Sequence, residues 1–197
     1  MIFNIPSSTS PDFTSLIYEA VRILDTGGVI AMPSDTIYGV FCRYNAANIK
    51  RLHEIKKRPL DKPFLLVFPE AYPLDEFVNT AAIDAEMTRE IESLWPGKNT
   101  IILPKKKNLE YPPGDTIAIR KPSREASIFF YETLNRLNKP LLAPSLNFHG
   151  DQPLHKIEDM QRAFSGIVDA IFFNPEFVPG EASRIWDLTR KPFVRLR

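Results

Sequence analysis

The chain of 197 residues has few of the residue types on which several classes of protein depend. Cys42 is the only cysteine, so no disulfide can form within the chain and a cysteine-based zinc site is not expected. The three histidines lack the helical spacing of paired metal ligands, so we expect no metal held by protein side chains alone. There are only eight glycines, and neither of the glycine-rich phosphate loops, GxxxxGK[ST] and GxGxxG, occurs. Any nucleotide would therefore be bound mainly by side chains.

An excess of charge and a long apolar run are also missing. The formal net charge is +1, so nothing in the bulk composition indicates a nucleic-acid coat or a membrane anchor, and any basic site must be local. No apolar run approaches the roughly 20 residues that a transmembrane helix needs, and the first residues do not resemble a secretory signal. Hydrophobic residues make up 44% and charged residues 25%, which is ordinary for globular proteins. We expect a soluble, cytoplasmic protein.

Helical and β-rich stretches alternate along the chain without an internal repeat. Apolar residues at helical spacing between positions 12 and 26 are followed by Gly27-Gly28, which indicates a helix and its end. The same reasoning predicts helices at 12–26, 46–57, 81–94, 123–137 and 156–164, and strands at 28–32, 64–68, 100–104, 116–120, 141–143, 168–173 and 184–188. Because these strands do not simply alternate with helices, we predict an α/β fold: one domain over 1–197, with a twisted, open, mixed sheet and flanking helices.

Three cations surround the end of the predicted helix 46–57. Lys56 and Arg58 are two positions apart, so they would point in different directions if the helix continued. Pro59 moves the residue before it out of the helical region, which lets the side chains of Lys56 and Arg58 face one space, and Lys62 follows shortly after. Cations at a helix C-terminus also stabilise the helix dipole, so a purely structural cap is an equal alternative at this point.

Further polar side chains follow predicted strands. Thr36 and Tyr38 come after the strand 28–32 and could line a pocket or simply form a turn. Ser145 and Asn147 follow the strand 141–143, and their spacing of two puts both on one face of an extended segment. The stretches WPGKNT (95–100) and AIRKP (118–122) lie at similar strand-to-loop transitions. Together these segments favour one shared pocket.

The order and spacing of these segments identify a known family. GGVIAMPSDTIYGV, KKRPLDKPFLLVF, WPGKNTIIL, IAIRKP, APSLNFHG and SRIWDLT occur in the register of the YrdC/TsaC family of threonylcarbamoyl-adenylate synthases, which the chain resembles over about residues 10–197. The family hallmark, Lys-x-Arg followed much later by Ser-x-Asn, is present as Lys56-Lys57-Arg58 and Ser145-Leu146-Asn147. The resemblance implies a single-domain short form with a basic central cavity.

The implied reaction joins L-threonine, bicarbonate and ATP, with Mg²⁺ on the triphosphate, into threonylcarbamoyl-AMP and pyrophosphate. Other proteins then transfer the threonylcarbamoyl group to tRNA. By matching to the family, Lys56 and Arg58 are the catalytic candidates. The candidates for ATP binding are Arg58, Lys62, Thr100, Arg120, Ser145, Asn147 and Arg197, and those for threonine binding are Thr36, Tyr38, Arg120 and Ser183.

Two features differ from the family pattern and leave alternatives open. Arg184 stands where the family has a threonine after Ser183, and Arg195 competes with Arg197 as the nucleotide contact. One alternative is a module that binds double-stranded RNA or tRNA on the same fold. Another is a divergent paralogue that binds a nucleotide for a different carbamoyl transfer, which Arg184 would favour.

Overall fold

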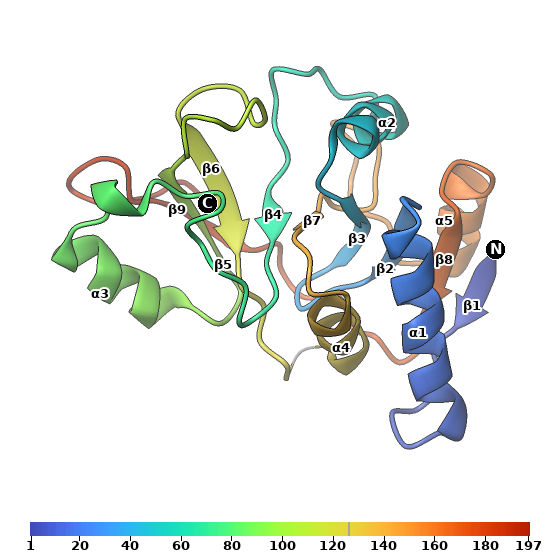
Figure 1. Ribbon diagram of the computed structural model, residues 1–197. Helices are drawn as coiled ribbons and strands as arrows, with labels where there is room; N and C mark the ends of the chain where they lie inside the picture. Colours follow the sequence, from blue (N-terminus) through green and yellow to red (C-terminus); the bar gives the residue numbers. More distant parts are fainter. Residues whose placement is uncertain (126) are drawn as a thin grey trace.

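The computed structural model describes residues 1–125 and 127–197 (Figure 1). The strands are β1 (Ile2–Asn4), β2 (Ile30–Pro33), β3 (Tyr38–Arg43), β4 (Leu66–Val67), β5 (Asn99–Pro104), β6 (Thr116–Arg120), β7 (Leu141–Leu142), β8 (Ala170–Phe173), β9 (Arg184–Asp187) and β10 (Val194–Arg195). They form one sheet in the order β1-β8-β2-β3-β7-β4-β6-β5-β9-β10. Parallel pairs such as β2 with β8 lie beside antiparallel pairs such as β5 with β6, so the predicted mixed sheet is confirmed.

Helices cover both faces of this sheet. They are α1 (Pro11–Asp25), α2 (Ala46–Lys56), α3 (Ala85–Leu94), α4 (Ile128–Leu137) and α5 (Ile157–Phe164), with a short 3-10 helix at Thr80–Ala82. Ile30 and Met32 of β2 pack in one apolar cluster with α1 and α4, whereas Ala31 packs in the other cluster, to which α2, α3 and α5 contribute. Both faces are therefore buried, which explains why the central strands are almost continuously apolar.

The predicted helices and strands correspond to observed ones, with shifted ends. The helix predicted over 123–137 begins at Ile128, where the Ser127 side chain accepts a hydrogen bond from the Phe130 N–H. Residue 126, which falls inside the predicted range, lies outside the described residues. None of the helices in the described ranges is long and apolar enough to cross a membrane. The domain limits stay a prediction.

Strand β3 was not predicted, because the polar residues before it and Gly39 inside it favoured a turn. Gly39 is required by packing: a Cβ there would lie 2.5 Å from the Phe41 ring and 3.2 Å from the Pro144 carbonyl oxygen. The absence of a side chain lets the segment after β7 approach β3, where Gly39 and Ser145 form an isolated bridge. This close approach builds one wall of the site described next. Strands β1 and β10 were also missed, and both are only two or three residues long.

Candidate functional site

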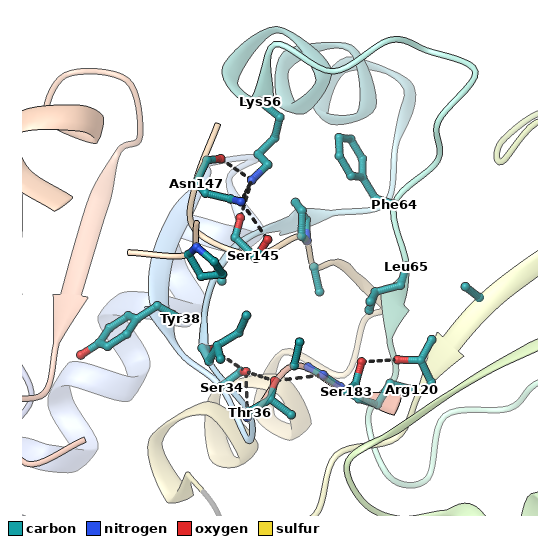
Figure 2. Close-up of a pocket in the computed structure, with 18 of the residues that line it drawn as sticks. Ser34, Thr36, Tyr38, Lys56, Phe64, Leu65, Arg120, Ser145, Asn147 and Ser183 are labelled. Carbon is teal, nitrogen blue, oxygen red and sulfur yellow. Dashed lines mark hydrogen bonds between the residues drawn. The ribbon is translucent and has the colours of Figure 1, made fainter. Parts of the chain in front are cut away.

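A cavity of about 410 Å³ lies in the middle of the molecule, between the loop after β2, the end of α2, the loop after β7 and strands β5, β6 and β9 (Figure 2). All but one of the predicted site residues line it: Thr36, Tyr38, Lys56, Arg58, Thr100, Arg120, Ser145, Asn147, Ser183 and Arg197. The charged side chains of the lining include Lys56, Arg58, Arg120 and Arg197, and among the described residues Asp151 is its one carboxylate. The cavity is therefore basic.

Lys56 joins the two halves of the family hallmark. Its Nζ donates to the main-chain oxygens of Ser145 and Asn147 and, at 2.6 Å, to Asn147 Oδ1 (Figure 2). Ser145 Oγ donates to the same Oδ1 at 2.8 Å. The His149 N–H donates to the Lys56 carbonyl at 2.9 Å, which fastens this loop to the end of α2. Lys56 and its partners, which are 89 and 91 positions away in the chain, are thus assembled as one polar group.

The environment of Lys56 opposes its charge. The residue is only 2% exposed, and this burial lowers the pKa of Lys56 to about 7, with a further contribution from the positive charge of Arg58. Three oxygen atoms nevertheless surround Nζ and match the three N–H donors of an ammonium group. Burial and these hydrogen bonds thus act on the charge of Lys56 in opposite directions, so its charge depends strongly on whatever enters the cavity.

Arg58 reaches the cavity because α2 ends abruptly. Lys57 adopts a left-handed conformation with φ 49°, and the Arg58 N–H closes the helix end by donating to the His53 carbonyl at 3.0 Å. The Arg58 guanidinium donates to the carbonyls of Lys62 at 2.7 Å and Pro63 at 3.1 Å. Lys56 and Arg58 both line the cavity, and Lys57 contributes to this break in the helix as well as Pro59.

A buried ion pair lies at one end of the cavity. Arg120 Nη2 is 3.0 Å from Asp35 Oδ1, and Arg120 Nη1 donates to Thr36 Oγ1 at 3.1 Å. Burial raises the pKa of Asp35, while the charge of Arg120 lowers it. Asp35 was not among the predicted site residues, although it stands beside Thr36 in the sequence. Asp35 becomes part of the site only through its ion pair with Arg120, which is distant in the sequence.

A hydroxyl pair lies between β5 and β9. Thr100 Oγ1 and Ser183 Oγ are 2.8 Å apart and both residues are buried, while Arg197 Nε donates to the Ser183 carbonyl at 3.0 Å. Arg197 lines the cavity, whereas Arg195 is outside the lining and donates to the Arg197 carbonyl. Arg184 is exposed and outside the lining, although its neighbours Ser183 and Ile185 belong to it.

Two predicted ligand residues are placed less favourably. The Tyr38 hydroxyl donates to the Asn174 carbonyl at 3.2 Å and accepts from the Asn174 N–H at 3.0 Å, and Figure 2 shows it pointing away from the Ser34–Thr36 cluster. Burial raises the pKa of Tyr38 to about 12. Lys62 is exposed and contributes its carbonyl to Arg58, without lining the cavity. Ligand contacts from these two side chains stay predictions.

An apolar wall of the cavity was not among the predictions. Pro63, Phe64 and Leu65 line it just before β4, and His149 and Asp151 line it beyond Asn147. The apolar run that begins at Phe64 indicated only a strand, because its position at a cavity depends on the loop that precedes it. Within residues 1–125 and 127–197, no cluster of three or more His, Cys, Asp or Glu residues is placed to hold a metal ion.

Known proteins resemble this chain over most of its length. The profile of the Sua5/YciO/YrdC family, described as "Telomere recombination", matches residues 22–197. A threonylcarbamoyl-AMP synthase of Coxiella burnetii (strain RSA 493 / Nine Mile phase I) is 30% identical over 168 residues, which are 83% of this chain and 88% of that protein. One of Pyrococcus abyssi (strain GE5 / Orsay) is 30% identical over 185 residues, which are 90% of this chain and 52% of that protein.

Solved structures agree with these relatives. The structure of P. abyssi Sua5 complexed with L-threonine superimposes with a TM-score of 0.86 at 26% identity, covering 100% of this chain and 57% of that one. E. coli YciO has a TM-score of 0.82 at 25% identity, covering 100% of this chain and 94% of that one. The chain thus spans about half the length of the P. abyssi relative and most of the length of the other two. With both the family profile and the fold matched over nearly all its residues, the chain belongs to the Sua5/YciO/YrdC family.

Proposed function

We propose that this protein is a threonylcarbamoyl-AMP synthase, which makes threonylcarbamoyl-AMP from L-threonine, bicarbonate and ATP for the modification of tRNA. The observation that carries the proposal is the assembly of Lys56, Arg58 and Arg120 around one cavity with Ser145 and Asn147. Two relatives bear the name of this activity, and a similar structure is a complex with L-threonine.

The chemistry explains why such a cavity is needed. The amine of threonine and bicarbonate form a carbamate with loss of water. A carbamate oxygen then attacks the α-phosphorus of ATP, the bond from that phosphorus to the bridging oxygen breaks, and pyrophosphate leaves. Carbamate and ATP are both anions, so they repel each other unless fixed cations neutralise them. Arg58 suits this role because its planar guanidinium grips phosphate oxygens in pairs, while Lys56 acts as a point charge.

The ends of the cavity suggest an orientation for the substrates. Arg120, Thr36 and Ser183 provide a cation and hydroxyls for the carboxylate and hydroxyl of threonine. Ser145 and Asn147, beside Lys56, would face the nucleotide. Thr100 and Arg197 adjoin Ser183, so they would bind the nucleotide where it meets the threonine. The volume of about 410 Å³ lies within the usual range of small-molecule sites.

Mg²⁺ fits this proposal as a companion of the triphosphate. Among the described residues, the lining sets one lysine and three arginines against one carboxylate, Asp151, which suits phosphate binding and would be a poor set of ligands for a metal ion. When bound with ATP, the ion would neutralise phosphate charge, and the residues named above would hold the nucleotide.

The proposal is tested by measuring pyrophosphate release from ATP with purified protein. Release is expected only when threonine and bicarbonate are both present. Release that does not depend on threonine would refute the synthase and support the divergent paralogue. That alternative is weakened because Arg184, the residue that favoured it, is outside the cavity lining.

RNA binding alone is not favoured by the comparisons, since the named relatives are enzymes. A direct contact with tRNA, or with the proteins that receive the product, belongs to the proposal as a separate question. Tight, salt-sensitive binding of tRNA without turnover of ATP would overturn the enzymatic proposal.

A further inference from the structure

We propose that His53 and Tyr111 are positioning residues that hold Arg58 at the cavity. They close the loop from Arg58 to Phe64, which connects α2 to β4. The inference rests on the proposed function for what Arg58 binds, and on the hydrogen bonds around His53 for how Arg58 is held. Neither His53 nor Tyr111 lines the cavity, so they would act through Arg58.

Three hydrogen bonds join the two ends of this loop. The Phe64 N–H donates to Tyr111 Oη at 2.7 Å, and Tyr111 Oη lies 3.2 Å from His53 Nε2. His53 Nδ1 lies 3.0 Å from the Arg58 carbonyl oxygen. We call this chain of contacts, from Phe64 through Tyr111 and His53 to Arg58, the Tyr111 clasp. It fixes the first and last residues of the loop relative to each other.

The three contacts restrict where the protons of the clasp can lie. A main-chain carbonyl can only accept, so His53 Nδ1 must carry a proton and donate it to the Arg58 carbonyl. Tyr111 Oη already accepts from the Phe64 N–H, so its own proton is free to be donated to His53 Nε2. In a neutral imidazole, the clasp therefore places the ring proton on Nδ1.

The clasp is enclosed by aromatic rings. His53 is 4% exposed, its ring lies 4.4 Å from the Phe64 ring between centroids, and it meets Tyr111 edge to face at 5.9 Å. The Tyr44 hydroxyl donates to the Tyr111 carbonyl, so Tyr111 is held by its main chain as well. Breaking one of these hydrogen bonds would leave a buried polar group unpaired, which costs free energy. The intact clasp is therefore stable.

The contacts of Arg58 lie within the loop that the clasp closes. Its guanidinium donates to the carbonyls of Lys62 and Pro63 and lies 5.3 Å from the centroid of the Phe64 ring. If Phe64 or the Arg58 main chain shifts, these carbonyls move and the guanidinium loses its support. Opening the clasp should therefore lower the affinity for the nucleotide and leave the affinity for threonine unchanged.

The first test is Tyr111→Phe, which keeps the ring and removes the oxygen atom. We expect the Kd and KM for ATP to rise about fivefold, the loss corresponding to roughly one hydrogen bond, with KM for threonine changed less than about twofold. Tyr72→Phe is the matched control, because the Tyr72 hydroxyl bonds Glu76 away from the loop, and it should leave both values unchanged. An unchanged ATP affinity in Tyr111→Phe would overturn the proposal.

A double-mutant cycle separates positioning from general loosening of the structure. In an Arg58→Ala background, Tyr111→Phe should have no further effect on ATP affinity, because the residue it positions is gone. The same fold-loss in both backgrounds would show that Tyr111 acts independently of Arg58. Since calorimetric binding of ATP needs neither threonine nor turnover, this cycle remains readable even if the synthase activity is absent.

The proton arrangement gives two further tests, of which the first needs no substrate. Nitrogen-15 NMR of the His53 ring in the free protein should show the Nδ1–H tautomer. His53→Asn, whose amide keeps a donor near the Nδ1 position, should retain more ATP affinity than His53→Leu. A His53 ring protonated on Nε2, or equal losses in the two variants, would refute the clasp.

Discussion

Burial and the neighbouring Arg58 guanidinium disfavour the charged form of Lys56. A bound triphosphate would favour the charged form instead. Its pKa of about 7 means that most molecules carry neutral Lys56 at pH 8. Because an anion favours the charged form, binding of ATP should raise the pKa of Lys56 and draw in a proton. We predict net proton uptake of nearly one at pH 8, measured by calorimetry in buffers of different ionisation enthalpy.

Lys56→Met is the control for this measurement, because it keeps a long apolar stem and removes the titrating amine. ATP itself is fully ionised at pH 8, so it contributes no proton release there. The uptake should disappear in the variant. Equal uptake in both proteins would mean that another group titrates and that Lys56 lies away from the phosphates.

Arg58 offers a second test at the residue scale. Its planar group donates to two carbonyls and faces the cavity at once, which a lysine cannot reproduce. We predict that kcat/KM falls by about 100-fold in Arg58→Ala and by at least about tenfold in Arg58→Lys. The melting temperature should change by less than about 3 °C, because Arg58 is half-buried and its partners are loop carbonyls. A large drop in melting temperature would instead support the helix-cap interpretation.

The sequence identifies site residues that belong to short, spaced motifs. Lys56, Arg58, Ser145 and Asn147 could be found because six segments of the chain occur together in the register of one family. Asp35 could not, since a carboxylate becomes part of a site only when Arg120 is brought 3.0 Å away by the fold. His53 and Tyr111 were missed for the same reason. The histidines were considered only as possible metal ligands, and nothing local links Tyr111 to the loop after α2.

Among the elements, α4 contains a buried hydroxyl that has no apparent use in packing. Thr133 is fully buried, and Oγ1 has no hydrogen-bond partner among the residues that the structure describes. Thr133→Val replaces the hydroxyl with a methyl group of similar size, so we predict that the free energy of unfolding rises by about 1 kcal/mol. Urea denaturation with an unchanged m-value would check this.

Thr100 in β5 provides the matched comparison. It is also fully buried, but its hydroxyl is paired with Ser183. Thr100→Val should lower the free energy of unfolding by about 1–2 kcal/mol, because Ser183 would lose its buried partner. A change of stability in the same direction in both variants would contradict this explanation, which depends on Thr100 having a hydroxyl partner and Thr133 having none among the described residues.

Element boundaries depend on details that the pattern of apolar residues does not contain. The end of α2 at Lys56 was predicted to within one residue because Pro59 follows, yet the left-handed Lys57 was not foreseen. Strand β3 was missed because Gly39 is normally a turn residue, and its need for a close approach to Phe41 and Pro144 exists only in the folded state. Contacts between distant segments thus account for most of what the sequence could not predict.

At the scale of the whole molecule, the cavity draws residues from both halves of the sheet. A ligand there would contact β3 and the loop after β7 on one side and β5, β6 and β9 on the other. Saturating ATP at about 100 times its Kd should therefore stabilise the entire fold by about 2.7 kcal/mol. We predict a rise in melting temperature of about 5–10 °C with ATP and Mg²⁺. A scan with pyrophosphate and threonine separately would show whether each end of the cavity contributes.

The pairing of β1 with β8 has a consequence for how the protein is made. Ile2 lies opposite Ile171, and β2 reaches β1 only through β8, which sits between them. Strand β2 can pair with β3 as soon as both are made, but its other edge, and all of β1, must wait until the ribosome has released residues 170–173. An open strand edge can pair with other chains. The longer the sheet takes to complete, the more the protein is therefore exposed to aggregation during synthesis.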